Sequence, residues 1–247
     1  MSQLENGIRI NKYLSEIGFC SRREADRLIE QGRIRINGIV SLMGQKGSGD
    51  EKIEVNGKLM TISKSKSIYL AFNKPRGIVC TTDQKREKNN IIDFINYPSR
   101  VFPIGRLDKM SEGLIFLTND GDIVNKILRA KNNHEKEYIV EVNKPITDDF
   151  TKMMSNGVPV LDTVTNKCFV KKTGKKTFRI VLTQGLNRQI RRMCEYFGYK
   201  VTYLQRIRIM NISLDIPVGE YRDFTAKELN QIHQSVKHSV KIFEGNK

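Results

Sequence analysis

One short segment holds the densest set of residues that could do chemistry. Gly105-Arg106-Leu107-Asp108-Lys109 places a single aspartate between two cations, in a predicted loop between two apolar stretches. Cations close to a carboxylate favour its ionised form, which is the form that can attack a substrate. Taken alone, the segment is more typical of an ordinary charged turn, so its interpretation depends on the rest of the chain.

A second segment, residues 184–193, begins a stretch rich in cations. Between residues 185 and 210 the only acid is Glu195, and the cations are Arg188, Arg191, Arg192, Lys200, Arg206 and Arg208. We expect a helix capped by Asn187, with an apolar face of Ile190, Met193, Cys194 and Phe197. Arg188, Arg191 and Arg192 lie away from that face and could reach a ligand. A solvated polar face has the same pattern, but so large an excess of cations is more than solubility requires.

The composition favours an acidic ligand. The 247 residues have a formal net charge of +16, and 38% of them are hydrophobic, which is enough for a packed core. Such a charge attracts polyanions, and nucleic acid is the leading candidate. A basic protein that binds no nucleic acid is the alternative.

Several protein classes are disfavoured by what the sequence lacks. No run of 18 apolar residues predicts a membrane span, and the first residues do not resemble a signal peptide. The four cysteines are scattered, so they predict free thiols in a reducing cytoplasm and no zinc site. Neither a dinucleotide fingerprint nor a phosphate-binding loop is present. We therefore expect a cytoplasmic protein, acting as a monomer, with no metal and no cofactor.

The chain divides into two predicted domains, residues 1–67 and 68–247, with a polar linker at 57–67. In the first domain we expect a helix at 10–17 and a second helix after Ser21. The sequence Ser21-Arg22-Arg23-Glu24 has the form of a capping box, in which the serine and the glutamate cap each other's backbone amides. After this helix ends at Gly32, strands are expected at 33–36 and 53–55, each followed by an Asn-Gly turn.

Arg22 and Arg23 stand at the start of the second helix, where the helix dipole disfavours cations. Helix amides and two guanidinium groups could together clamp a phosphate. Two solvated arginines beside a cap would look the same, and the local pattern does not decide between these readings. The order of elements over residues 8–57 resembles the small RNA-binding domain first seen in ribosomal protein S-four. That resemblance implies RNA contacts from Lys12, Arg22, Arg23 and Arg33, and it implies nothing about catalysis.

The second domain mixes short strands and helices, and a helix does not follow every strand. Strands are expected at 68–72, 113–118, 137–142 and 178–182, and helices at 122–130, 148–156 and 188–197. This order favours an α+β fold, with a mainly antiparallel mixed sheet and flanking helices, over a doubly wound parallel sheet.

Four segments resemble, in order, the pseudouridine synthases that modify ribosomal RNA at single sites. They are Asn73-Lys74-Pro75-Arg76-Gly77, Gly105-Arg106-Leu107-Asp108, Glu135-Lys136-Glu137-Tyr138 and residues 185–193. The resemblance spans nearly the whole chain, and residues 102–138 and 184–192 are most similar to a bacterial type that modifies the large-subunit 23S RNA. It implies that a uridine flipped out of its stack is isomerised to pseudouridine without a cofactor.

The same resemblance implies roles for individual residues. Asp108 matches the catalytic carboxylate, which attacks either the ribose C1′ or the uracil C6. Arg191 matches the basic residue that pairs with this carboxylate, and Tyr138 matches the tyrosine that stacks on the flipped base, although a strand tyrosine with apolar neighbours is usually a core residue. Contacts to RNA are expected from Lys74, Arg76, Arg106, Arg188 and Arg192, with Arg106 as the candidate to fill the gap left by the base.

Two other functions remain as alternatives. A non-catalytic RNA-binding protein, such as a ribosome assembly or rescue factor, would explain the charge and the first domain but would leave the second domain without a role. A DNA-binding regulator would need a recognition helix, and the helix after Ser21 has few side chains suited to reading bases.

Overall fold

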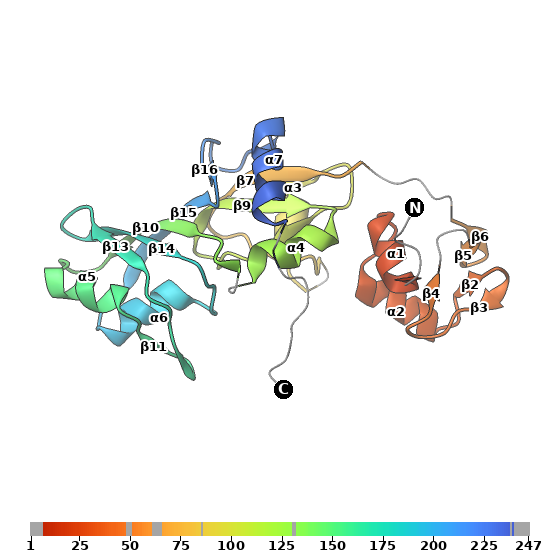
Figure 1. The fold of residues 1–247 in the computed structure, drawn as a ribbon, viewed down its shortest axis with the longest axis horizontal. Helices are drawn as coiled ribbons and strands as arrows, with labels where there is room; N and C mark the ends of the chain where they lie inside the picture. The colour runs from red at the N-terminus through yellow and green to blue at the C-terminus, as the bar shows by residue number, and fades with distance from the viewer. Residues whose placement is uncertain are drawn as a thin grey trace. The chain divides into compact units, whose positions relative to one another are not determined.

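The computed structural model describes residues 7–47, 51–60, 66–84, 86–129, 132–237 and 239. The chain forms two compact units, Met1–Ser67 and Ile68–Lys247 (Figure 1). One cluster of buried apolar side chains forms the core of the first unit, and two other clusters form the core of the second unit.

The first unit combines two short helices with strands in hairpins. Its helices are α1 (Ile10–Glu16) and α2 (Arg22–Glu30), and its strands are β1 (Ile8–Arg9), β2 (Ile34–Ile36), β3 (Ile39–Val40), β4 (Lys46–Gly47), β5 (Ile53–Val55) and β6 (Lys58–Leu59). The order β3-β2-β5-β6 makes one antiparallel sheet, and β1 pairs with β4. The apolar faces of both helices and of β2 and β5 share one core, as the sequence periodicity predicts.

The start of α2 agrees with half of the predicted capping box. The Ser21 hydroxyl accepts a hydrogen bond from the Glu24 amide at 3.1 Å, so the serine caps the helix. The Glu24 carboxylate pairs with Arg27 at 2.6 Å instead of turning back to the Ser21 amide. A cation one turn along the helix competes successfully for this carboxylate, because the two side chains are neighbours on the helix surface.

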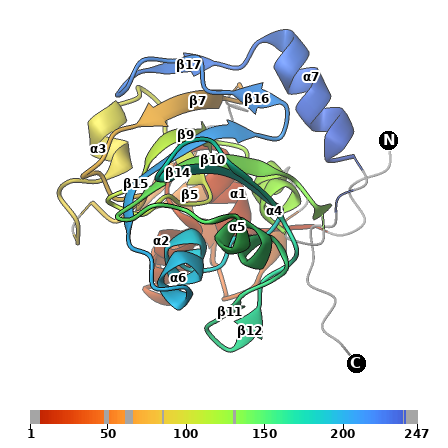
Figure 2. The ribbon, with the colours of Figure 1, turned by 90° about the vertical axis from the view of Figure 1, so that its left-hand side faces the viewer.

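The second unit is built on a nine-stranded mixed sheet whose main path is β13-β14-β10-β15-β9-β7-β17. Its strands are β7 (Tyr69–Lys74), β8 (Phe102–Ile104), β9 (Glu112–Thr118), β10 (Lys136–Val142), β13 (Phe169–Lys172), β14 (Thr177–Leu182), β15 (Val201–Ile209), β16 (Ile212–Ser213) and β17 (Tyr221–Asp223). A separate hairpin, β11 (Pro159–Val160) with β12 (Thr163–Val164), projects beside α6 (Figure 2). Nearly all pairings are antiparallel, which confirms the predicted α+β class.

Helices cover both faces of this sheet. On one face lie α3 (Ile91–Ile95), α5 (Asp148–Ser155) and α6 (Gln189–Tyr196), and on the other lie α4 (Gly121–Leu128) and α7 (Ala226–Ser235). The alternation of strand side chains divides the core accordingly: Leu70 and Phe72 of β7 face the first group, whereas Tyr69 and Ala71 face the second. Figure 2 shows α5 and α6 together, with α7 at the far edge of the sheet.

The middle of the sheet holds its one parallel pairing among the described strands. β15 runs antiparallel to β10 and parallel to β9, where Arg206 lies opposite Gly113. Gly113 has a φ of +103°, and a Cβ at this position would lie 2.3 Å from the Arg206 carbonyl oxygen. Only glycine permits this approach, so the close contact fixes how β9 and β15 meet.

Candidate active site

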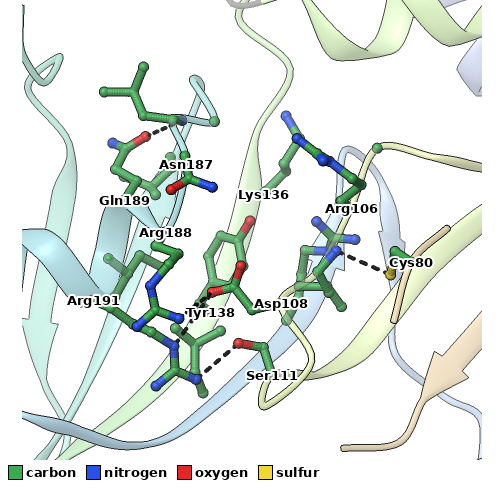
Figure 3. Close-up of a pocket in the computed structure, with 18 of the residues that line it drawn as sticks. Cys80, Arg106, Asp108, Ser111, Lys136, Tyr138, Asn187, Arg188, Gln189 and Arg191 are labelled. Atoms are coloured by element: carbon green, nitrogen blue, oxygen red, sulfur yellow. Dashed lines mark hydrogen bonds and ion pairs between the residues drawn. The ribbon is translucent and has the colours of Figure 1, made fainter. Parts of the chain in front are cut away.

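A cavity of about 550 Å³ opens in the second unit, within the size range of small-ligand sites. Its walls come from the loop before β9, from β10 and β15, and from the start of α6 (Figure 3). The lining is strongly cationic around one carboxylate, Asp108, and its cations are Arg106, Lys109, Lys136, Arg188, Arg191 and Arg206. Such a cavity is suited to a negatively charged ligand that is partly apolar.

The backbone around Asp108 is held from three directions. The Leu107 amide donates a hydrogen bond to the Cys80 sulfur at 3.3 Å, and the Ser111 amide donates to the Asp108 carbonyl oxygen at 3.0 Å. The Gly77 amide donates to the Lys109 carbonyl oxygen at 2.7 Å, which ties the loop to the turn after β7. The aspartate is therefore on a fixed turn, and its side chain, 32% exposed, reaches into the cavity.

Two arginines from the start of α6 meet this carboxylate. Arg191 Nε lies 3.5 Å from Asp108 Oδ2, and Arg188 Nη1 lies 3.8 Å from the same oxygen. Both distances exceed the 2.7–2.9 Å of a charge-assisted hydrogen bond, so these are loose ion pairs that leave the carboxylate free to approach a substrate. Arg191 is only 11% exposed, whereas Arg188 is 46% exposed and the weaker partner.

The Arg191 guanidinium is fixed by neutral partners as well. It donates to the Met110 carbonyl oxygen at 3.2 Å, the Ser111 hydroxyl at 3.1 Å and the Val201 carbonyl oxygen at 3.4 Å. Burial lowers the pKa of Arg191, while the Asp108 charge acts in the opposite direction. The arginine thus bridges the Asp108 loop to the strand after α6, and it remains the cation of the pair.

The start of α6 differs from its prediction. The residue at the N-cap position is Arg188, which adopts a left-handed conformation with φ 52° and makes no side-chain cap. Asn187 does not cap the helix, because its carbonyl and side-chain oxygens accept hydrogen bonds from Arg192. The side chain of Gln189 instead accepts from the Leu186 amide at 3.0 Å. The left-handed turn at Arg188 directs its side chain toward Asp108.

Tyr138 lies on β10 and forms part of the cavity wall. It is buried and belongs to the main core cluster, and it also lines the cavity. Tyr138 is therefore both a core residue and a residue that a ligand in the cavity can contact. The Arg206 guanidinium lies 6.0 Å from the centre of its ring. Figure 3 shows Tyr138 beside Asp108, so a planar group that stacks on the ring would lie within reach of the carboxylate.

Comparison with known proteins agrees with this arrangement. Residues 68–196 match the model of the RNA pseudouridylate synthase family, and residues 8–41 match that of the S4 domain. The dual-specificity RNA pseudouridine synthase RluF of Salmonella typhi is 57% identical over 95% of this chain and 82% of its own length. The chain belongs to the RNA pseudouridine synthase family.

Two further proteins show how far the similarity extends. The ribosomal large subunit pseudouridine synthase B of Bacillus subtilis strain 168 is 32% identical over 95% of this chain and 99% of its own length. A crystal structure of a pseudouridylate synthase superposes with a TM-score of 0.67 at 27% identity, covering 91% of this chain and 99% of that one. The predicted enzyme class and the predicted RNA-binding module are thus confirmed, and the readings as a non-catalytic factor or a DNA-binding regulator are set aside.

The structure corrects the predicted role of Lys74 in this pseudouridine synthase. The Lys74 side chain is fully buried at the end of β7, and its ammonium donates to the carbonyl oxygens of Pro75 and Ile78 at 2.7 and 2.9 Å. Burial lowers the pKa of Lys74. The lysine is placed to hold the turn after β7 and not to reach a phosphate. Arg76 and Arg106 are exposed, and Arg106 lines the cavity.

The cations expected to touch RNA in the S4 domain lie at its surface or near it. Arg22 and Arg23 are exposed in the first turn of α2. Arg33 is exposed and donates to the side chains of Asn56 and Gln31. The ammonium of Lys12 lies 3.3 Å from Glu16, one helical turn away.

Two cavity cations of this synthase were not singled out from the sequence. Lys136 on β10 is 7% exposed and Arg206 on β15 is 3% exposed, and both line the cavity. A buried cation in a strand breaks the usual rule that charged residues mark the solvent face. The signal that could have found Lys136 is its spacing, because it lies two residues before Tyr138 and therefore on the same face of the strand.

Across the described ranges, no three His, Cys, Asp or Glu side chains gather as a metal ion would require. Likewise, no helix that the structure describes is long and apolar enough to cross a membrane.

Proposed function

We propose that this enzyme isomerises a uridine of ribosomal RNA, in the 23S RNA of the large subunit, with Asp108 as the nucleophile. The observation that carries the proposal is the carboxylate of Asp108 in a cationic cavity, held 3.5 Å from Arg191 and next to the buried ring of Tyr138. The relative from Bacillus subtilis is named for the large ribosomal subunit, which supports that choice of RNA. The place of action is then the cytoplasm, where ribosomal RNA is made.

The geometry supports a division of tasks among the three residues. Arg191 and Arg188 orient the Asp108 carboxylate, because their guanidinium groups lie 3.5 and 3.8 Å from its Oδ2. Tyr138 offers a flat, buried surface on which a flipped uracil can stack. Asp108 then attacks either C1′ of the ribose or C6 of the uracil, and the base rejoins the ribose through carbon. Substrate and product are isomers, so no co-reactant is consumed.

RNA binding in this proposal extends beyond the cavity. Arg76, Arg106, Arg188 and Arg192 contact RNA from the catalytic domain, residues 68–247, and Arg106 fills the gap left by the flipped base. Lys12, Arg22, Arg23 and Arg33 contact backbone phosphates from the domain of residues 1–67. The match of residues 8–41 to the S4 domain supports the second set. In this proposal the protein acts as a monomer.

The test uses RNA that carries tritium at uracil C5, because formation of the C5–C1′ bond releases that tritium. Purified 23S RNA, 16S RNA and transfer RNA are incubated separately with the enzyme; transfer RNA is included because two relatives are named dual-specificity enzymes. We expect release from 23S RNA and none from any RNA with Asp108→Asn, which is isosteric but cannot attack. Release from 16S RNA alone would overturn the choice of 23S RNA. Turnover by Asp108→Asn within tenfold of wild type would overturn the role of the aspartate.

A further inference from the structure

Lys136 and Arg206 form a pair of buried cations in the cavity wall. Each of them lines the cavity and is less than one tenth exposed. Lys136 donates to the His134 carbonyl oxygen at 3.2 Å, and Arg206 Nε donates to the Leu114 carbonyl oxygen at 2.6 Å. Within the described part of the chain, neither cation has a carboxylate at ion-pair distance, and Arg206 Nη2 is buried without any hydrogen-bond partner.

A β-bulge brings the two cations to the same wall. Along the β10–β15 ladder Glu137 lies opposite Arg208, but Tyr138 lies opposite Arg206, so Ile207 is an extra residue in β15. The bulge turns Arg208 to the far face, where it pairs with Glu137 at 2.8 Å, and turns Arg206 to the cavity beside Tyr138. Bulges of this kind commonly redirect a side chain next to an active site.

The two buried cations destabilise the folded protein when no ligand is bound. Burying a charge without a counter-ion destabilises the folded protein, and a second like charge nearby destabilises it further. Burial, together with the neighbouring Arg206, lowers the pKa of Lys136 to about 8. A pair of this kind is expected where a ligand brings the missing negative charge into the site.

The reaction generates such a charge on the base. If Asp108 attacks C6, the π electrons of the C5–C6 bond move toward C4 and place the charge on O4. If the N1–C1′ bond breaks first, its electron pair stays on N1 and is shared with O2 and O4. O4 carries negative charge on either route, so one pair of cations at that oxygen serves both.

We propose that Lys136 and Arg206 bind O4 of the flipped uracil and stabilise the negative charge that develops there during isomerisation. This inference rests on the proposed function, because it assigns two further residues to the same reaction. The position of the pair fits, since both side chains lie on the wall that contains Tyr138, on which the base stacks. Preorganised donors aimed at a developing charge raise the rate without tightening ground-state binding.

The central variant is Lys136→Met, which keeps the length of the side chain and removes the charge. In single-turnover reactions at pH 7 with saturating enzyme, we expect the rate to fall by about 10²- to 10³-fold, the usual effect of losing one such donor. We expect the RNA dissociation constant to change less than twofold. Lys175→Met removes an exposed charge outside the cavity and should leave both quantities unchanged.

A second readout separates this role from a structural one. Because Lys136→Met replaces an unpaired buried charge by an apolar side chain, its melting temperature should rise above that of wild type. A lysine that served to hold the fold would give a lower melting temperature instead. Lys74→Met is the matched comparison: this buried lysine holds a turn through two carbonyl oxygens, and its loss should lower the melting temperature.

The pH profile gives a third readout. The charged or titratable groups around Lys136 are Arg206 on β15 and His134 in the preceding loop, with Arg106 and Asp108 across the cavity. An ammonium is needed, so kcat/KM of the wild type should fall as pH rises through about 8, the pKa of free Lys136. Lys136→Arg stays charged, so it should keep part of the activity and should not show this fall below pH 9.

These outcomes decide the proposal. A wild-type single-turnover rate in Lys136→Met would overturn it, as would a loss confined to the dissociation constant and to its salt dependence, which would instead assign the pair to a phosphate. A fall near pH 8 that persists in Lys136→Arg would also count against it. If the wild-type enzyme itself released no tritium from any ribosomal RNA, the proposed function would fail, and the melting temperatures would still test whether the lysine is held at a cost.

Discussion

Replacing Arg191 by methionine tests the central ion pair directly. The substitution removes the charge 3.5 Å from Asp108 Oδ2 and leaves the more distant, more exposed Arg188 as the only arginine that the described part of the chain places within 4 Å of that carboxylate. It also removes the hydrogen bonds to Met110, Ser111 and Val201, so the carboxylate loses both its counter-charge and a fixed neighbour. The apolar face of α6 is not touched, so the helix should still pack.

The size of the effect follows from the distance and the exposure. Two charges about 4 Å apart interact by about 4 kcal/mol at an effective dielectric constant of 20, and by about 1 kcal/mol in water. Because the Asp108 side chain is 32% exposed, an intermediate value of about 1.5–3 kcal/mol is appropriate. If the transition state loses this much, the single-turnover rate should fall by about 10- to 150-fold, at about 1.4 kcal/mol per factor of ten.

The assay is tritium release under single-turnover conditions with excess enzyme, which separates chemistry from RNA binding. Arg191→Lys should retain more activity than Arg191→Met, because it keeps a charge but not the planar guanidinium that reaches three partners. Arg192→Met is the control: its guanidinium contacts only Asn187 among the described partners, and it does not line the cavity. If Arg191→Met reacted at the wild-type rate while Arg192→Met did not, the ion pair would be irrelevant and the reasoning refuted.

Two further variants probe RNA binding and the sheet. Replacing Arg22 and Arg23 by alanine should reduce the slope of log K against log salt by roughly one to two units, measured by RNA titration between 50 and 200 mM salt, whereas Arg27→Ala, already paired with Glu24, should change it less. An unchanged slope would mean that the two arginines face solvent only. Gly113→Ala should lower the unfolding free energy by about 3–5 kcal/mol, because its Cβ would lie 2.3 Å from a backbone oxygen. Gly77→Ala is the matched control, because Gly77 also has a positive φ of +90° but has nothing within 4 Å of an added Cβ, and an equal loss in both variants would contradict the close-contact argument.

The sequence predicted the elements well where local chemistry decides them. Ser21 caps the helix that follows it, as predicted, because its hydroxyl accepts a hydrogen bond from the Glu24 amide. Asn187 was an equally good candidate, and it failed because Arg192 takes up its oxygens. Arg188, which lies between Asn187 and the helix, has a left-handed backbone conformation that no local sequence pattern predicts.

The sequence predicted some of the site residues correctly and missed others whose positions depend on tertiary contacts. The loop of Asp108 and its partner Arg191 were recognised through their resemblance to a family, and the structure brings the two side chains within ion-pair distance. Arg188, which was expected only to contact RNA, also lies near this carboxylate. Lys74 was expected to contact RNA through the same resemblance, yet its side chain is buried and its ammonium donates to two carbonyl oxygens. Arg206 faces the cavity only because of an extra residue in β15, and strand periodicity cannot predict the register at such a bulge.

The central position of β15 has a consequence for how the protein is made. Before residues 201–209 leave the ribosome, β10 has one open edge, and β9 has an edge that β8 covers only over residues 116–118. Open edges of this kind pair readily with other chains, so the nascent catalytic unit is exposed to aggregation until late in its synthesis. Insertion of β15 closes the edge of β10, pairs with the start of β9 and places Arg206 beside Tyr138. A chain stalled before residue 201 would therefore be both unfolded at its centre and inactive, so activity can appear only after most of the sequence has been translated.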